Sequence, residues 1–476
     1  MNKLLPVHRE ELAVFVCLSV MMFLATFVHG FARILKDALV LSHSSAEMLS
    51  ALKVWVVWPA SITFILVYMK LSDSITRTKL YHGFNLFFVA FFLLYVWVIY
   101  PHYQSWRLHL GSSVWVTNHS AVRYLVMVVD HWPSSCFYML AEMWSSVMSS
   151  VLTWEIANHI TSMEQSKRFY SLYGTFRSLG LMAASLCASY EASRNVDWGM
   201  TLHNSIYLIV VAAMLLSLAL TTLCRVVGFE RVNKDVSEGS IVKKRKPKVS
   251  LLDSIRHVLS SKTILLITLL ILCYGISINL VEGVWKKSME LYFAGQGNQL
   301  QHFIGRVNFF ISFSSVTLGV SATYLLNIMG WRLAALVAPM AVLVSGSVFF
   351  VGMVGGGGSS VALYGIPFLK IAIYAGATTV LLARATKNSF FDSTKEMVYI
   401  PLSAELRTKG KAAAETIGMR FGKGGGAVIQ QLLLAIFSGS SLLDLAPFLG
   451  ICLAAVLVMW FYSVFYLDRL YSKVRG

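Results

Sequence analysis

Charged side chains occur inside apolar stretches of this sequence, at the spacing of a helix. In "HGFARILKDALV", His29, Arg33, Lys36 and Asp37 follow one another at intervals of four, three and one residues, so they share one helical face. An ionisable group inside an apolar helix is costly and normally faces a cavity or a charged partner. These residues therefore form the first part of a candidate polar site.

Two further apolar stretches carry polar faces of the same kind. In "LAEMWSSVMSSVLTWEIANHI", Glu142 stands above a stripe of hydroxyl groups that runs towards Asn158. In "INLVEGVWKK", Asn279, Glu282 and Lys286 lie on one face. Both stretches add candidate ligands or ion-pair partners.

Two stretches near the C-terminus add more cations. "KAAAETIGMRFGKGGGAVIQQ" places Arg420 and Lys423 on one face, and the three glycines that follow let a neighbouring backbone or a ligand approach closely. "FFDSTKEMVYIPL" (390–402) carries Lys395 between two carboxylates at the edge of an apolar run. We expect these cations to belong to a polar pathway for an anion.

The charges on these faces do not balance. Lys36, Arg420 and Lys423 need anionic partners, and Glu142 and Glu282 do not supply enough. A multiply charged anion such as a nucleotide phosphate chain would complete the balance, because Arg and Lys are the usual ligands of phosphate. The alternative is that the charges only form interhelical salt bridges that hold a bundle together.

Motifs for chemistry on a bound substrate are lacking. "GMRFGKG" (418–424) has the wrong glycine spacing for a nucleotide-hydrolysing P-loop, and no Ser or Thr follows its lysine. The sequence has no zinc-type His/Cys cluster and no nucleophile elbow, and its six cysteines lie in or beside apolar runs. We expect no enzyme activity, no metal and no cofactor.

The composition shows which elements position these residues. Of 476 residues, 57% are hydrophobic and 13% charged, and the mean hydropathy is +0.66. Long apolar runs predict an all-α polytopic membrane protein. The predicted spans number twelve: 12–40, 52–69, 80–100, 133–158, 169–190, 204–224, 263–285, 303–327, 333–353, 360–383, 412–438 and 443–467.

The distribution of basic residues predicts the orientation. With the N-terminus inside, the inner connections hold 27 Lys and Arg and the outer ones hold 5, including Lys286 and Lys287. The positive-inside rule then places both termini in the cytoplasm of a cell with the protein in its inner membrane. The net charge of +17 is thus explained by membrane topology, and we expect lipid contact but no nucleic acid partner.

A basic linker divides the chain into two halves. We predict a six-helix bundle over 1–226, a cytoplasmic linker over 227–261 containing "KKRKPK", and a second bundle over 262–476. A faint repeat supports this division, since "TWEIANHI" and "TKEMVYI" begin 241 residues apart. Two similar bundles facing each other are typical of major-facilitator-like, alternating-access transporters, and we expect a monomer.

The sequence resembles the ATP/ADP translocase family of obligate intracellular bacteria and plastids. The matching stretches run along nearly the whole chain: "KDALV", "FYMLAEMWSSVMSSVLTWEIANHIT", "KRFYSLYG", "YGISINLVEGVWK", "FFDSTKEMVYIPL", "KGKAAAETIG" and "RFGKGGGAVIQQ". The resemblance implies a twelve-helix nucleotide transporter that often exchanges host ATP for internal ADP. By motif it also implies transport roles for Lys36, Glu142, Glu282 and Lys423.

The sequence departs from the family pattern in places that bear on the substrate. "GKGGG" replaces "GKSGG" and so loses a hydroxyl at Gly424, while "WKKSMELYFAG" (285–295) brings in Glu290 and Phe293. Base preference therefore stays open. The leading hypothesis is nucleotide exchange; a proton-coupled nucleotide importer, in which Glu142 or Glu282 titrates, and a scaffold without transport are the alternatives.

Overall fold

The computed structural model describes most of the chain. The described residues are 7–72, 74–110, 120–194, 196–228, 232, 261–355, 362–363, 366–403, 406 and 410–475. The side chains of Thr416, Arg420 and Lys423 lie outside the described part, although their backbone is helical. Most of the predicted basic linker also lies outside it.

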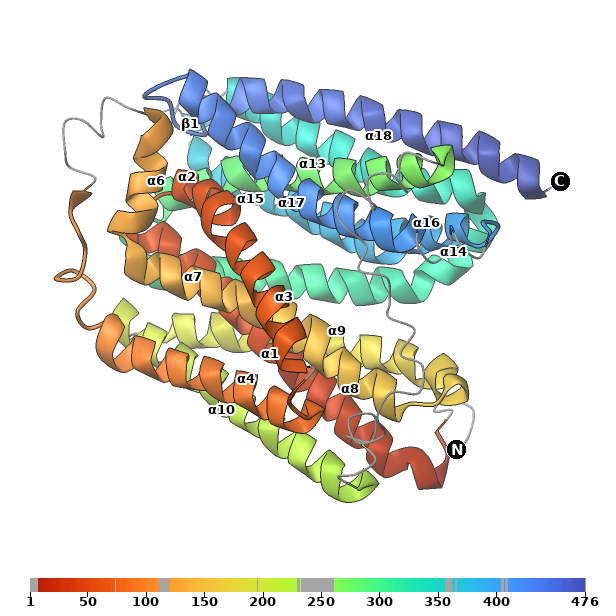
Figure 1. Cartoon of the computed structure of the whole chain (residues 1–476). Coiled ribbons are helices and arrows are strands. Elements are labelled where there is room, and N and C mark those ends of the chain that lie inside the picture. The colour runs from red at the N-terminus through yellow and green to blue at the C-terminus, as the bar shows by residue number, and fades with distance from the viewer. Residues whose placement is uncertain are drawn as a thin grey trace.

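The first half is a bundle of long helices (Figure 1). In lipid, a helix satisfies every backbone hydrogen bond within its own segment, which explains why apolar runs of this length become helices. The elements are η1 (Arg9–Glu11), α1 (Leu12–His43), α2 (Ala46–Ala51), η2 (Leu52–Val57), α3 (Trp58–Ser72), α4 (Arg77–Leu94), η3 (Tyr95–Ile99), α6 (Ser120–Asp130), α7 (Trp132–Trp144), η5 (Ser145–Leu152), α8 (Thr153–Ile160), α9 (Met163–Ser193) and α10 (Trp198–Val227).

The second half repeats this design. Its elements are α13 (Lys262–Tyr292), α14 (Gly297–Gly355), β1 (Ala362–Leu363), β2 (Ile366–Pro367), α15 (Phe368–Thr386), η7 (Lys387–Phe391), α16 (Asp392–Tyr399), α17 (Lys411–Ile436) and α18 (Ala446–Arg475). Gly330, with φ +72°, breaks α14 into two segments of membrane length.

Nine helical segments of the described part are long and apolar enough to cross a membrane. The protein is therefore a multi-pass membrane protein. Three more helical stretches are of similar length but more polar: α7 through α8, α9, and α17. They include the stretches in which the sequence places Glu142, Arg420 and Lys423.

One predicted span begins in the wrong place. The sequence predicts a helix from residue 360, but α15 begins at Phe368. A short antiparallel hairpin, β1 with β2, precedes it, and Pro367 supplies the last residue before the helix. Proline has no backbone N–H and is tolerated at the start of a helix, not within one, which accounts for the later start.

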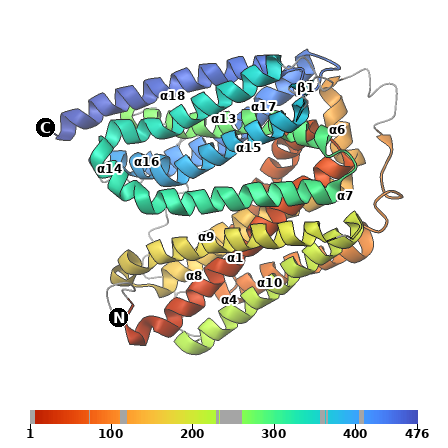
Figure 2. The same cartoon turned by 180° about the vertical axis from the view of Figure 1, so that it is seen from behind.

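The two halves have matching internal packing. In the first, α1 packs against α7, α9 and α10; in the second, α13 packs against α15, α17 and α18. Figures 1 and 2 show the halves as two groups of helices with both chain ends on the same side of the molecule. The all-α, major-facilitator-like prediction is confirmed.

The repeat noticed in the sequence corresponds to a repeated distortion of the helix. A π-helical segment, η5, precedes the helix that starts at Thr153, and another, η7, precedes the helix that contains Thr394. Such wide turns inside helices are rare and often occur at functional sites. Each half thus has the same interrupted helix, α7–η5–α8 or α15–η7–α16.

Candidate functional site

Lys36 on α1 is held by a group of partners in its own half. Its Nζ lies 3.1 Å from Glu142 Oε2, 3.5 Å from Asp37 Oδ1 and 3.7 Å from the centre of the Tyr138 ring. Because Lys36 is 4% exposed, these contacts replace the water that a cation requires. The polar faces predicted on α1 and α7 therefore meet.

A matching pair joins two helices of the second half. Arg384 on α15 donates a hydrogen bond to Glu282 on α13, and both side chains are largely buried. The sequence places Arg384 in an inner connection, which is wrong because α15 continues to Thr386. In each half, then, an ion pair links the first helix to the interrupted helix, with the cation on α1 in one half and on α15 in the other.

Two polar contacts cross from one half to the other beside these pairs. Lys286 Nζ of α13 lies 2.7 Å from Asp37 Oδ2 of α1, and Lys53 Nζ of η2 donates to Asn279 Oδ1 of α13 at 2.8 Å. The sequence assigned Lys286 to an outer connection, but it is 6% exposed within α13, which ends at Tyr292.

We call the eight charged residues at this junction the central cluster: Arg33, Lys36, Asp37, Lys53, Glu142, Glu282, Lys286 and Arg384. Five are cations and three are carboxylates. Among the described residues, Arg33 and Lys53 have no carboxylate within ion-pair distance, although both lie in the electrostatic field of Asp37 and Glu282.

The cation excess thus differs in part from the one predicted. Lys36 is paired, and the unpaired cations are Arg33 and Lys53. Asp37 does not balance Arg33, because it is engaged by Lys36 and Lys286. Lys53 sits within the apolar run "ALKVWVVWPA", where a lysine is itself a signal that sequence analysis could have used.

Two predicted site residues lie in other contacts. Lys395 Nζ is 2.6 Å from Glu415 Oε1 and 3.6 Å from Asp392 Oδ1, so it joins α16 to α17. Asn158 is exposed at the end of α8 and accepts a hydrogen bond of 2.5 Å from Tyr170. In the part of the chain that the structure describes, neither contacts the central cluster.

The glycine run after Lys423 is a site of close helix packing. A Cβ atom on Gly424 would lie 1.6 Å from the ring of Trp58 on α3, and one on Gly426 would lie 3.0 Å from the carbonyl oxygen of Ile276 on α13. The expected close approach of a neighbour is confirmed. It also explains the missing hydroxyl in "GKGGG", because Trp58 occupies the space that a serine side chain would need.

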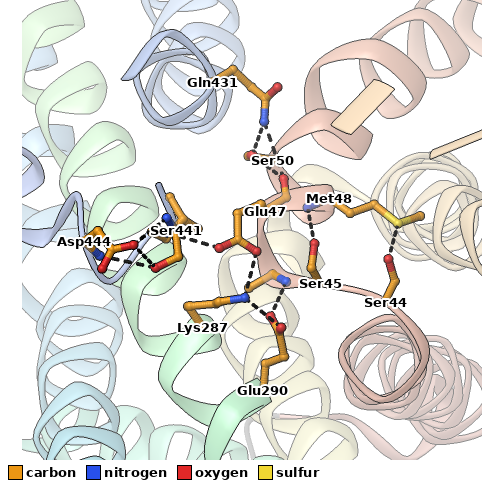
Figure 3. Close-up of polar contacts among 12 residues, drawn as sticks. Ser44, Ser45, Glu47, Met48, Ser50, Lys287, Glu290, Gln431, Ser441 and Asp444 are labelled. Atoms are coloured by element: carbon orange, nitrogen blue, oxygen red, sulfur yellow. Dashed lines mark hydrogen bonds and ion pairs between the residues drawn. The ribbon is translucent and has the colours of Figure 1, made fainter. Parts of the chain in front are cut away.

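A third group of contacts joins the halves at the end of the molecule away from both termini (Figure 3). We call it the outer latch because it lies at the end remote from both termini, and it consists of Glu47, Ser50, Lys287, Glu290 and Gln431. Lys287 Nζ lies 3.1 Å from Glu47 Oε2 and 2.7 Å from Glu290 Oε1. Gln431 donates to Ser50 Oγ at 2.5 Å.

Backbone groups complete the outer latch. Glu290 Oε2 accepts from the N–H of Ala46 at 2.6 Å, and Glu47 Oε1 accepts from the N–H of Leu442 at 3.1 Å. Glu47 is only 2% exposed, and Lys287 was wrongly predicted to lie in an outer connection. The departure noted at Glu290 therefore has a structural counterpart, a contact between the two halves.

The opposite end is arranged differently. At the end that carries both termini the two groups of helices stand further apart, as both views show (Figures 1 and 2). Glu142 keeps 32% of its side chain exposed, so the central cluster is not sealed. The halves are thus joined by the outer latch on one side of the cluster and stand further apart on the other, at the splayed end.

A family of known proteins matches nearly the whole chain. The family model described as TLC ATP/ADP transporter matches residues 1–471. The chain belongs to this family. The match takes in all of the central cluster and the outer latch, so the family resemblance seen in the sequence is confirmed.

Relatives within the TLC family cover almost the full chain. The ADP,ATP carrier protein 3 of Rickettsia bellii is 34% identical over 98% of this chain and 96% of its own length. The ADP,ATP carrier protein 1 of Chlamydia muridarum is 33% identical over 98% of this chain and 90% of its own.

Solved structures show the same fold at low sequence identity. A bacterial homologue of the iron transporter ferroportin in its inward-facing state gives a TM-score of 0.62 at 12% identity, covering 97% of this chain and 99% of that one. The nucleoside transporter NupG gives 0.55 at 11% identity, covering 96% and 99%. The TLC chain therefore has a fold shared with transporters of other substrates.

Proposed function

We propose that this protein exchanges nucleotides, ATP against ADP, across the membrane by alternating access, and that it acts as a transporter and not as an enzyme. The observation that carries the proposal is the central cluster, where five cations and three carboxylates meet between the two halves. The names of its relatives point to the same substrates.

The unpaired cations favour exchange over one-way flux. Closing an empty site would bring Arg33 and Lys53 into a space of low dielectric with too few carboxylates, and like charges repel strongly there. A polyphosphate would supply the missing negative charge, so the loaded carrier could change state and the empty one would be hindered. Arg420 and Lys423 are proposed to join a substrate-binding set with Arg33, Lys36, Glu142, Asn279 and Glu282. The cations of this set would bind the phosphates.

The proposed topology rests on the distribution of basic residues along the sequence. Twelve membrane crossings, arranged as bundles over 1–226 and 262–476 with a cytoplasmic linker between them, would put both termini in the cytoplasm of an inner membrane protein, here taken to be a monomer. The splayed end would then face the cytoplasm. Lys395, with its carboxylate partners, and Asn158 would line the cytoplasmic entrance and not the binding site.

Counter-transport tests the proposal. Vesicles containing the purified protein and preloaded with unlabelled ADP are expected to take up labelled ATP several times faster than empty vesicles, and a protonophore should leave that rate unchanged. If uptake into empty vesicles is equally fast and collapses with the protonophore, the proton-coupled importer replaces the exchanger. Glu142→Gln would then be the diagnostic variant, because Glu142 is the most exposed carboxylate of the cluster's ion pairs.

Single cysteines test the topology in a variant that lacks the six native cysteines. Ser74, in the turn before α4, and Ser438, after α17, are both exposed and lie at opposite ends of the molecule. Ser438→Cys is expected to react with an impermeant thiol reagent added outside intact cells, while Ser74→Cys should react only after permeabilisation. The reverse pattern would invert the proposed orientation.

A further inference from the structure

A large cavity lies away from the central cluster, where α9, α14 and α15 meet near the end of the outer latch. Its volume is about 820 Å³, and its polar lining includes Arg194, His302, Arg306 and Lys370. A smaller cavity of about 330 Å³ between α9 and α14 shares His302, Arg306 and Phe310 with it. The two adjoin at these shared residues, and we call them together the flank recess.

The flank recess carries positive charge without matching carboxylates. Arg306 and Lys370 are exposed, and among the described residues neither has a carboxylate within ion-pair distance. Arg194 has one, since its Nη1 lies 3.2 Å from Glu191 Oε2. None of the described residues that line the recess is an aspartate or a glutamate.

Arg306 lies where a cation without a carboxylate partner is energetically unfavourable. It lies inside the apolar helical segment Gly297–Ala322, which is long enough to span the membrane. Arginine within a membrane helix is costly unless an anion or water neutralises it. An anion bound beside Arg306 would remove that cost.

The surroundings of the flank recess are apolar and face outwards. Leu186 is 52% exposed, Phe310 46% and Tyr374 56%, and all three line the recess. Figure 2 shows α9 and the first segment of α14 running side by side along this flank. Exposed aromatic and aliphatic groups on a membrane helix contact acyl chains, so the recess opens towards lipid.

We propose that the flank recess binds an acidic phospholipid. Its phosphate would sit between Arg306 and Lys370, where two charge-assisted contacts are available, and an acyl chain would follow the apolar path past Phe310 towards Leu186. A soluble anion would satisfy the cations but not the apolar path. The combination of both features selects a lipid.

The position of the flank recess gives the lipid a structural role. The recess takes Arg194 from the first half and Arg306 and Lys370 from the second. Beside it, the Ser189 hydroxyl lies 2.9 Å from His302 Nδ1, and Gln301 donates to the carbonyl of Ala188 at 3.0 Å, so the halves are in direct contact. A lipid bound here would stabilise the state in which this end is closed.

Native mass spectrometry of the full-length protein tests the proposal. The protein would be extracted from nanodiscs of phosphatidylcholine containing a fixed fraction of phosphatidylglycerol or cardiolipin. We expect the wild type to retain an acidic lipid, and the double variant Arg306→Gln/Lys370→Gln to retain it at least about tenfold less, because two contacts to a charged group are lost. The acidic lipid should also raise the Tm of the wild type but not that of this double variant.

Matched controls make the result specific. Lys70, near the end of α3, and Lys79, on α4, are exposed cations outside the flank recess. The variant Lys70→Gln/Lys79→Gln therefore removes the same amount of charge elsewhere and should retain the lipid. Arg306→Lys/Lys370→Arg keeps both charges and should retain most of it, which guards against a loss caused by misfolding.

Two outcomes would overturn the proposal. One is equal retention of acidic lipid by the wild type and the Arg306→Gln/Lys370→Gln variant. The other is a rise in Tm with millimolar inorganic phosphate or glycerol phosphate that matches the rise with lipid, which would make the recess a site for a free anion. None of these measurements involves nucleotide exchange. A negative result would therefore contradict the lipid site but not the proposed function.

Discussion

At the scale of single residues, the central cluster contains two kinds of cation. Lys36 and Arg384 each balance a carboxylate, whereas Arg33 and Lys53 do not. Removing one partner of a buried ion pair strands the other and costs about 3–5 kcal/mol. Removing an unpaired cation strands no charge, so stability and substrate binding can be separated by experiment.

Lys53→Gln and Arg384→Gln are expected to differ in this way. Lys53→Gln should leave the Tm near that of the wild type and weaken nucleotide binding about 10- to 100-fold, the effect of losing one charge-assisted contact of about 1.5–3 kcal/mol. Arg384→Gln should lower the Tm, because Glu282 loses its closest cation. Thermal unfolding and binding titrations on the purified variants measure both quantities, and a Lys53→Gln variant with unchanged affinity would remove Lys53 from the site.

A charge exchange tests the pair on α1 and α7. Lys36→Glu and Glu142→Lys each place two like charges about 3 Å apart, so each single variant should unfold more readily and transport poorly. The double variant restores an ion pair and should regain most of the lost stability. Its transport would stay low if the substrate requires the cation on α1 and the carboxylate on α7. A double variant no more stable than the singles would mean that the pair does not hold α1 to α7.

Sequence reasoning reached part of this cluster. The helical period identifies the faces that carry Arg33, Lys36, Glu142 and Glu282, because charges inside apolar runs stand out. It does not say which neighbouring helix each face meets, so the partners of Asp37 and Glu282 could not be read from the sequence. Lys286 and Arg384 were assigned to connections because helix ends are the least certain feature of a sequence pattern.

At the scale of helices, the packing of α17 against α3 and α13 is the most tightly constrained contact. Gly424 has no room for a side chain beside Trp58. The sequence suggested close packing from three successive glycines, but only the structure names the tryptophan. The π-helical segments η5 and η7, at matching places in the two halves, were likewise beyond the sequence pattern, although the 241-residue repeat marks these places.

Gly424→Ser is therefore expected to destabilise the packing of α17 against α3. The serine side chain would displace Trp58 and move α3 away from α17, lowering the free energy of unfolding by an amount typical of overpacking, about 1–3 kcal/mol, and the Tm with it. Gly424→Ser combined with Trp58→Ala should recover part of the loss because the space is vacated. Thermal unfolding of both variants, with Trp58→Ala alone as the control, gives the comparison; additive losses in the double variant would contradict the proposed clash.

At the scale of the whole molecule, the outer latch determines which side is closed. Glu47 and Glu290 both depend on Lys287, and Glu47 is nearly inaccessible to water. An inhibitor of transport that binds at the splayed end would be expected to favour the state in which the outer latch is closed. Opening the other side must break these contacts, so their strength sets part of the balance between the two states.

Lys287→Gln is expected to shift the balance towards the state that is open at the outer end. In a variant without native cysteines, Ser50→Cys should then be labelled faster by an impermeant thiol reagent from outside, since Ser50 is only 2% exposed when the latch is closed. Lys70→Gln serves as the control because it removes an exposed lysine far from the latch. Equal labelling in all three backgrounds would show that Lys287 does not hold this end closed.

The ion pairs of the two halves carry their cation on non-equivalent helices, and this affects how a substrate is oriented in the site. Two halves with identical charges would offer an elongated anion two equivalent poses, related by rotation about the pseudo-twofold axis. With the cation on α1 in one half and on α15 in the other, the two poses differ in energy. In the proposed site, the base and the phosphate tail of a nucleotide would then face different halves, and a photoreactive adenine analogue should label the helices of one half only.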